Sequence, residues 1–185
     1  MVAIIDYDAG NVRSLQFALE RLGVESTLTA DPEIIKAADK VIFPGQGAAA
    51  SAMEKLKHNG LDQLIPTLKQ PVLGICLGMQ LLCDATEEGD VNGLGIIPGK
   101  VIRFSNQVKV PQMGWNTILH LQSPLFKNIN EGDFMYLVPK KTAKKKRSPR
   151  KSKMDLVILQ RLEQIETKLA RDAWEINELC KRIEL

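Results

Sequence analysis

The stretch PVLGICLGMQ, Pro71 to Gln80, joins an apolar run to a cysteine that has one glycine two residues before it and another two residues after it. The apolar run predicts a buried strand that ends at Cys76, and Leu77–Asp84 predicts a helix. This arrangement is typical of a nucleophile elbow, because glycine tolerates the close backbone contacts of the strained turn. A buried structural cysteine between packing glycines is the alternative. We expect a nucleophile whose pKa is lowered by the amides at the start of the helix.

Strands and helices alternate along the chain before this stretch. The expected extended segments are residues 2–6, 24–29, 40–43 and 71–75. The expected helices are residues 12–22, a helix opened by Asp31-Pro32, residues 48–57 and residues 61–68. This alternation predicts an α/β fold with an open, mostly parallel sheet and helices on both of its faces. Gly95–Val110 instead predicts short antiparallel strands.

Two glycine-bearing loops, Gly45–Gly47 and Gly74–Gly78, follow the third and fourth expected strands. In a parallel sheet the carboxyl ends of the strands share one edge, and binding sites form there. The backbone amide of Leu77 is expected to be available to a developing oxyanion, with a second amide supplied by the Gly45–Gly47 loop. We assign Cys83, which falls within the expected helix, to packing and give Cys180 no role.

Composition and charge bound the class of protein. The 185 residues are 44% hydrophobic, which is enough for one core with an appended segment. Three cysteines without disulfide or zinc spacing favour reduced thiols, so we expect no metal and a cytoplasmic location. The start of the chain lacks the basic region of a signal peptide, and no apolar run reaches about 20 residues, so we expect no membrane segment.

Four segments together carry a family resemblance: VIFPGQG, PVLGICLGMQLL, EEGDVNGLGIIPGKVIRF and VPQMGWNTI. In order and spacing they resemble the class I glutamine amidotransferases, whose fold is flavodoxin-like, and the likeness covers residues 1–138. The segments DYDAGN and MGWN narrow it to the glutaminase subunits of imidazole glycerol phosphate synthase, which act in histidine biosynthesis. The resemblance implies an enzyme that hydrolyses glutamine to glutamate and ammonia without a cofactor.

The resemblance also implies roles for individual residues. Cys76 would attack the side-chain amide of glutamine and form a thioester. The oxyanion would be held at Gly45, Gly47 and Leu77, and Gln80 would help to hold substrate glutamine. Gln46 departs from the family, which often has a small apolar residue there.

The resemblance further implies a partner, the cyclase subunit of imidazole glycerol phosphate synthase, to which the ammonia would pass. The positions implied at the docking face are Asn11, Met113 and Trp115.

The catalytic base of the family has no counterpart in this chain. The family pairs its cysteine with a histidine and a glutamate further along the sequence, and the corresponding region here, WEINELCKRIEL, has no histidine. The two histidines, His58 and His120, do not match the position of the base. We therefore expect negligible glutaminase turnover. The fold is also expected to be incomplete at its C-terminal end, with an exposed apolar sheet edge.

The residues after Val138 differ in character from the body. Residues 139–153 hold nine Lys or Arg and no acid, so the rest of the chain has 16 basic residues against 22 acidic ones. We expect a truncated amidotransferase domain over 1–138, a basic linker over 139–153, and an amphipathic helix over 154–185. An apolar heptad rhythm broken at Asp172 supports that helix, which either packs on another surface or self-associates as a coiled coil. Nucleic-acid binding by the linker is disfavoured, because no aromatic residue interleaves its charges.

Three origins fit the change after Val138: a truncation or frameshift, an in-frame fusion, or a pseudoenzyme. An alternative function is a non-catalytic interaction protein, with an amidotransferase body that docks a cyclase and a tail that recruits another helix.

Overall fold

The computed structural model of the chain describes residues 1–8, 10–103, 114–119, 121, 128–137, 141–144 and 157–159. The first half contains β1 Val2–Ile5, α1 Val12–Arg21, β2 Ser26–Thr29, α2 Pro32–Ala37, β3 Lys40–Phe43, α3 Ala49–His58, α4 Leu61–Leu64, the 3-10 helix η1 Ile65–Thr67, β4 Val72–Ile75 and α5 Leu77–Leu82. The rest contains β5 Cys83–Thr86, β6 Val91–Asn92, β7 Ile97–Arg103, β8 Gly114–Thr117, β9 Phe134–Leu137, β10 Lys141–Lys144 and β11 Val157–Leu159. No helix in these described ranges has the length and apolar character that crossing a membrane requires.

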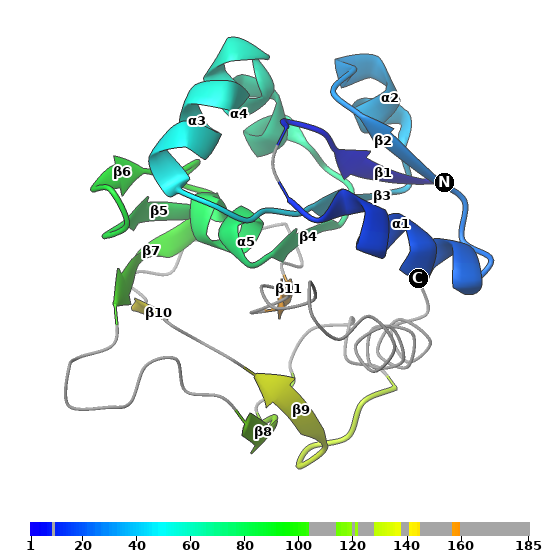
Figure 1. The fold of residues 1–185 in the computed structure, drawn as a ribbon, viewed down its shortest axis with the longest axis vertical. Helices are drawn as coiled ribbons and strands as arrows, with labels where there is room; N and C mark the ends of the chain where they lie inside the picture. Colours follow the sequence, from blue (N-terminus) through cyan, green and yellow to red (C-terminus); the bar gives the residue numbers. More distant parts are fainter. Residues whose placement is uncertain are drawn as a thin grey trace.

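A five-stranded parallel sheet forms the centre of the fold (Figure 1). Its strand order is β2-β1-β3-β4-β11, and every neighbouring pair is parallel. This is the doubly wound order in which the chain reverses its direction of growth between β1 and β3. The connections that follow these two strands lead to opposite faces of the sheet, α1 on one and α3 on the other, and leave a crevice at the carboxyl ends. The expected parallel α/β sheet is therefore confirmed.

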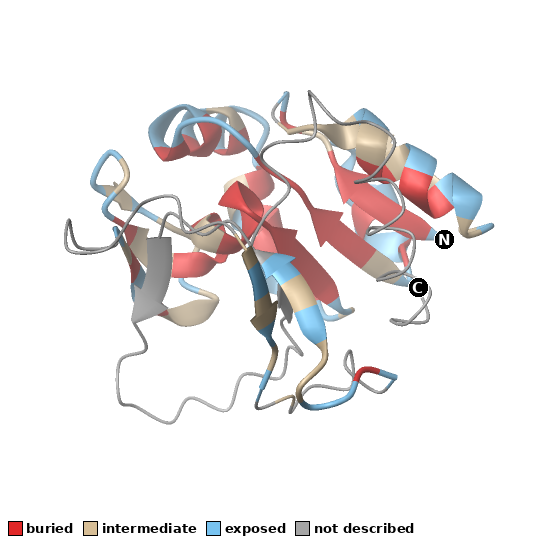
Figure 2. Cartoon of the chain, turned by 60° about the horizontal axis from the view of Figure 1, so that its bottom comes forward, coloured by how far each residue is buried: buried red, intermediate tan, exposed pale blue. Residues whose placement is uncertain are grey.

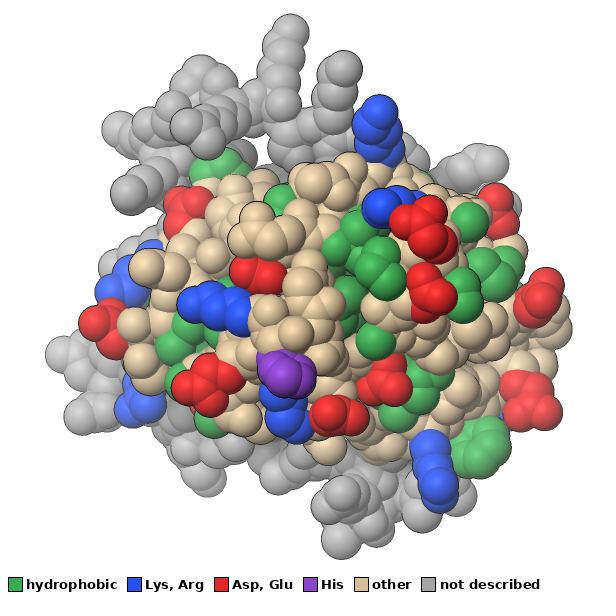
Figure 3. Space-filling model, turned by 90° about the horizontal axis from the view of Figure 1, so that it is seen from above, with side chains coloured by type: hydrophobic (Ala, Val, Ile, Leu, Met, Phe, Trp, Pro, Cys, Tyr) green, Lys and Arg blue, Asp and Glu red, His purple; other side chains and the backbone are tan. Residues whose placement is uncertain are grey.

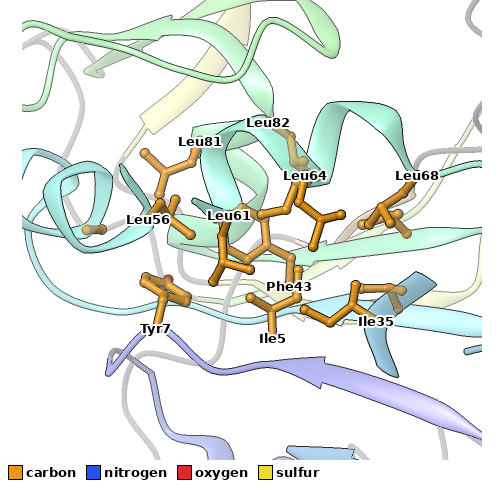
Figure 4. Packing of buried hydrophobic residues seen from close by; sticks show 14 of the residues in the cluster. Ile5, Tyr7, Ile35, Phe43, Leu56, Leu61, Leu64, Leu68, Leu81 and Leu82 are labelled. Carbon is orange, nitrogen blue, oxygen red and sulfur yellow. The ribbon is translucent and has the colours of Figure 1, made fainter. Parts of the chain in front are cut away.

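Alternate residues of the central strands face opposite sides of the sheet, as the two-residue period of a strand requires. On one side Ile5, Phe43 and Val72 join a cluster with α3, α4 and α5, and Figure 4 shows Ile5 and Phe43 in it beside Tyr7. On the other side Ile4 and Leu73 join a cluster with Leu15 and Leu19 of α1. These strands are buried on both faces, so they appear as the continuous red band of Figure 2. The two-sided core explains why the strands read as apolar runs without alternation.

The ends of the first two helices follow the capping signals of the sequence. The side chain of Asn11 accepts a hydrogen bond from the amide of Ser14 at the start of α1. Asp31 accepts one from the amide of Glu33 at 2.8 Å, directly before the N-terminal proline of α2. Gly23 follows α1 with φ +69°, the left-handed conformation expected of a C′ glycine.

The helix after Cys76 is shorter than the sequence predicted. It ends at Leu82, and Cys83 opens strand β5 instead of continuing the helix. The expected antiparallel region from Gly95 is realised in part, because β7 pairs parallel with β5 and antiparallel with β10. The reason is local: the amides of Leu94 and Ile96 donate to the carbonyls of Leu81 and Leu82, which ties the following segment to the end of the helix. The remainder of the expected antiparallel region, residues 104–110, lies outside the described residues.

Two short segments of the divergent tail are strands. Residues 141–144, expected in a basic linker, form β10 on the edge of β7. Residues 157–159, expected in a helix, form β11 beside β4, with Ile158 opposite Gly74. The edge of β4 that was expected to be exposed is therefore paired, because an open row of backbone donors and acceptors favours strand addition over an unanchored helix. The rest of the predicted linker and helix lies outside the described residues.

Candidate active site

Cys76 occupies a strained turn between β4 and α5. Its backbone has φ 53° and ψ −112°, and a non-glycine residue adopts such a positive φ only where the surrounding structure imposes it. The residue is 7% exposed and belongs to the cluster that packs against α1. The strand before it and the helix after it are both confirmed. The geometry is that of the predicted nucleophile elbow.

The two glycines around Cys76 are required by close packing. A Cβ atom on Gly78 would collide with the carbonyl oxygen of Phe43 and lie 2.8 Å from its carbonyl carbon. A Cβ on Gly74 would lie 2.6 Å from Cδ1 of Leu82 and 2.8 Å from Cα of Met79. These distances leave no room for a methyl group, so the elbow is pressed directly against strand β3 and its own helix.

The Gly45–Gly47 loop reaches the elbow from the carboxyl end of β3. A Cβ on Gly45 would lie 2.8 Å from the amide nitrogen of Gly78 and 2.9 Å from Cβ of Leu77. The amide of Leu77 donates to the carbonyl oxygen of Gly45 at 3.3 Å. The sequence predicted that this amide would be available to an oxyanion, and in the structure it is engaged. The close seating of the glycine loop explains the difference, since it brings a carbonyl where a second donor was expected.

Tyr7 is a neighbour of the site that the sequence analysis missed. It follows β1, is fully buried, and packs its ring edge-on against Phe43 with centroids 5.4 Å apart (Figure 4). Its hydroxyl donates to the carbonyl oxygen of Pro44 at 2.8 Å. Burial, and to a lesser extent the charge of a Cys76 thiolate, raise the pKa of Tyr7 well above its ordinary range. The phenol therefore keeps its proton and does not serve as a base for the thiol.

Gln80 presents an unpaired oxygen within the first turns of α5. Its backbone amide donates to the carbonyl of Cys76 at 3.1 Å, whereas its side-chain Oε1 is buried without a hydrogen-bond partner among the described residues. Buried carbonyl oxygens are normally paired, so an unpaired one on the residue one helical turn after Cys76 calls for an explanation.

A cavity of about 540 Å³ lies at the crevice between the carboxyl ends of β1 and β3. Its walls come from the loop after β1, the glycine loop and the first turns of α3. The lining residues are Asp6, Asp8, Gly10, Val12, Gln46, Gly47, Ala48, Ser51, Ala52 and Lys55. Lys55 crosses between the walls, because its Nζ donates to the backbone carbonyl of Asp8 at 2.6 Å. The outer side of the glycine loop thus faces this cavity, while its inner side contacts the elbow.

Comparison with known proteins places this geometry in a family. The family model described as "Glutamine amidotransferase class-I" matches residues 3–165. The chain belongs to the class I glutamine amidotransferase family. The match continues past Val138, where the sequence predicted a domain boundary, and this agrees with the pairing of β10 and β11 to strands of the amidotransferase body.

Two similar curated proteins are both HisH subunits of imidazole glycerol phosphate synthase. The chain is 56% identical over 140 residues to imidazole glycerol phosphate synthase subunit HisH of Bacteroides fragilis, a match that covers 74% of this chain and 71% of the relative. It is 48% identical over 143 residues to subunit HisH of Oceanobacillus iheyensis, with 75% and 71% covered.

Solved structures support the fold. A glutamine amidotransferase crystal structure matches with a TM-score of 0.51 at 20% identity, covering 63% of this chain and 64% of that one. A crystal structure described as that of "a putative gmp synthase subunit a protein" from Thermoplasma acidophilum matches with a TM-score of 0.54 at 17% identity, covering 77% of this chain and 65% of that one.

The amidotransferase body shows no substitute for the family's catalytic histidine within the described residues. His58 is the last residue of α3 and is exposed on the face shown in Figure 3, where it is purple. His120 lies outside the described residues. The described ranges also hold no group of three or more His, Cys, Asp or Glu side chains arranged to bind a metal ion.

The residues implied at the docking face are Asn11, Met113 and Trp115. Asn11 is half-buried and caps α1, and Met113 lies outside the described residues. Trp115 is 57% exposed on β8 and contacts Tyr136 of β9 edge-on, with ring centroids 5.6 Å apart. Phe134, two residues from Tyr136 on the same face of β9, is 67% exposed. The two strands therefore present an exposed aromatic face formed by Trp115, Phe134 and Tyr136, of which the sequence analysis identified only the tryptophan.

Proposed function

We propose that the chain is a glutaminase subunit of the imidazole glycerol phosphate synthase type, with Cys76 as the nucleophile. The observation that carries the proposal is the strained positive φ of Cys76 at the end of β4, seated against a glycine loop. The identity of 56% to subunit HisH of Bacteroides fragilis supports the choice of this type over other amidotransferases.

The proposed reaction begins with attack of the Cys76 thiolate on the side-chain carbonyl carbon of glutamine. A carbon–sulfur bond forms and the carbonyl oxygen becomes an oxyanion. When the oxyanion collapses, the carbon–nitrogen bond breaks, and ammonia leaves after taking up a proton. Water then hydrolyses the thioester to glutamate and restores the thiol. The unpaired Oε1 of Gln80 is a candidate acceptor for an N–H group of the bound glutamine.

Proton transfer is the step of this reaction for which the described residues supply no general acid or base. Ammonia must be protonated as it leaves, and the hydrolytic water must lose a proton. The described residues place no histidine at Cys76, and Tyr7 holds its own proton too tightly to exchange it. General acid–base catalysis contributes about 10²–10⁴-fold to rate. We therefore propose that turnover is lower than in an amidotransferase with a complete triad by about that factor.

The test is ammonia release from glutamine by the full chain, alone and with a cyclase subunit. We expect a slow release that Cys76→Ala abolishes and that Cys180→Ala leaves unchanged. Trapping of a glutamyl thioester on Cys76 by mass spectrometry would support the nucleophile even where turnover is too slow to measure. Rapid turnover that survives Cys76→Ala would refute the proposed mechanism.

A second candidate function is docking without catalysis, favoured by the exposed aromatic face of β8 and β9. Exposed aromatic side chains that pack against each other are the usual anchors of protein interfaces. We propose that this face, together with Asn11, binds a cyclase subunit. The proposed compartment is the cytoplasm, where a reducing environment keeps a thiol nucleophile active.

A further inference from the structure

Tyr7 joins the end of β1 to the glycine loop after β3, which lies 37 residues further along the sequence. Its hydroxyl donates to the carbonyl of Pro44, and a Cβ on the next residue, Gly45, would collide with the same hydroxyl oxygen. The phenol oxygen therefore lies directly against the backbone of the glycine loop at two successive residues. The ring cannot withdraw from this position, because it is fully buried and packed against Phe43.

The carbonyl group that Tyr7 binds is adjacent in the chain to the carbonyl group that covers the Leu77 amide. Pro44 carries the carbonyl bound by the phenol, and Gly45 carries the carbonyl that accepts from the amide of Leu77 at 3.3 Å. That distance is beyond the usual 2.7–3.2 Å of N–H···O bonds, so the hydrogen bond between the Leu77 amide and the Gly45 carbonyl is weak. The buried bond from Tyr7, at 2.8 Å, is the stronger of the two. Each bond restrains one of two consecutive carbonyls, so the first helps to fix the direction of the second.

We propose that Tyr7 is a positioning residue that latches the glycine loop with the Gly45 carbonyl over the Leu77 amide. The latch acts through the conformation of the glycine loop. Because both bonds belong to the same loop conformation, removal of the phenol hydroxyl shifts the loop toward conformations in which the Leu77 amide is uncovered. This inference rests on the proposed role of Cys76 as nucleophile.

The test compares two reactions of the same thiol in the full chain, in a Cys180→Ser background. In the first, the Cys76 thiolate attacks the carbonyl carbon of p-nitrophenyl acetate, passes through an oxyanion and expels coloured p-nitrophenolate, leaving an acetyl thioester. In the second, the thiolate displaces iodide from iodoacetamide at a saturated carbon, with no oxyanion. Neither reaction needs a histidine, because both leaving groups depart as anions. The ratio of the two rates therefore reports the availability of the oxyanion donor and cancels changes in thiol exposure.

For Tyr7→Phe, which keeps the ring, we expect the ratio of acylation to alkylation to rise by about fivefold, the shift given by the loss of one ordinary hydrogen bond. Thr67→Val is the matched control, because its hydroxyl donates to the carbonyl of Leu64 away from the site, and its ratio should equal that of the parent. An unchanged or lowered ratio in folded Tyr7→Phe would overturn the latch.

Two further measurements check the exposure of the Leu77 amide and the identity of the nucleophile. Hydrogen exchange at the Leu77 amide should be faster in Tyr7→Phe than in the parent, and equal exchange would count against the latch. If both reagents modify the Cys76→Ala chain as fast as the parent, the nucleophile itself is wrong, and the proposed function fails together with the latch.

Discussion

The backbone amide of Leu77 and the carbonyl oxygen of Gly45 are joined by a hydrogen bond of 3.3 Å across the candidate active site. The amide belongs to the residue that follows Cys76, the proposed nucleophile, and the carbonyl belongs to a loop from another strand. In this conformation the turn at Cys76 is formed, and the amide proposed as the oxyanion donor is engaged. The proposed acyl chemistry at Cys76 therefore requires movement of the loop, whatever group supplies the proton.

Gly78→Ala should destabilise the chain strongly, because the new methyl group would collide with the carbonyl of Phe43. We expect a loss of about 3 kcal/mol in the free energy of unfolding, measured by urea denaturation. Gly114→Ala is the matched control, since a Cβ there meets no atom within 4 Å, and its effect should stay within about 0.5 kcal/mol. Equal effects of the two substitutions would show that the elbow is not packed against β3 as described.

Cys83 should make stability fall in alkaline solution. Burial, with a smaller contribution from the Asp84 carboxylate, raises the pKa of Cys83 from 9.0 to about 11. Between these two values the unfolded chain loses the thiol proton and the folded chain keeps it, so the free energy of unfolding falls as pH rises from 9 to 11. Cys83→Ala should flatten this slope in thermal unfolding followed from pH 8.5 to about 11. The part of the slope due to Tyr7 remains, and an unaltered slope would contradict the assignment to Cys83.

Trp115→Ala should weaken binding of a cyclase subunit without altering the stability of the chain, because the side chain is largely exposed. A central aromatic anchor is worth about 2 kcal/mol or more, so the dissociation constant measured by calorimetry should rise by about 30-fold. Phe17→Ala on α1 is the control, since Phe17 and Trp115 are both 57% exposed. Weakening of the same size in both variants would argue against a specific docking face on β8 and β9.

Ile158→Pro should test whether β11 stabilises the sheet. Proline cannot donate a backbone hydrogen bond and is poorly tolerated in a paired strand, so we expect a loss of about 2 kcal/mol and faster hydrogen exchange in β4. Ile158→Val, which keeps the amide, should behave like the parent. If this segment were the predicted helix, proline would disrupt the helix and leave the protection of β4 unchanged.

The sequence predicted the central sheet well because its strands are buried on both faces. Continuous apolar runs such as VAII and VLGI can be predicted as buried strands without knowing which strand lies beside each of them. The predicted elbow followed from glycine spacing, and the structure shows the contacts that demand it. Tyr7 was missed because its role comes from a contact with Pro44, 37 residues away, which no local pattern reveals.

The errors have a common cause. The helix after Cys76 was predicted to include Cys83, and residues 157–159 were predicted to be helical, because apolar periodicity was read without knowledge of the sheet edges nearby. A strand edge offers backbone hydrogen bonds that a local pattern does not record. The covered Leu77 amide was missed for a related reason, since the direction of the Gly45 carbonyl is fixed by tertiary packing.

The cavity between the loops after β1 and β3 has a consequence for protein engineering. Its walls are mainly loop residues and the first turns of α3, and Ala52 alone among them belongs to the buried core. A combinatorial library that varies Gln46, Ser51 and Lys55 would therefore sample new binding specificities while the scaffold beneath stays intact.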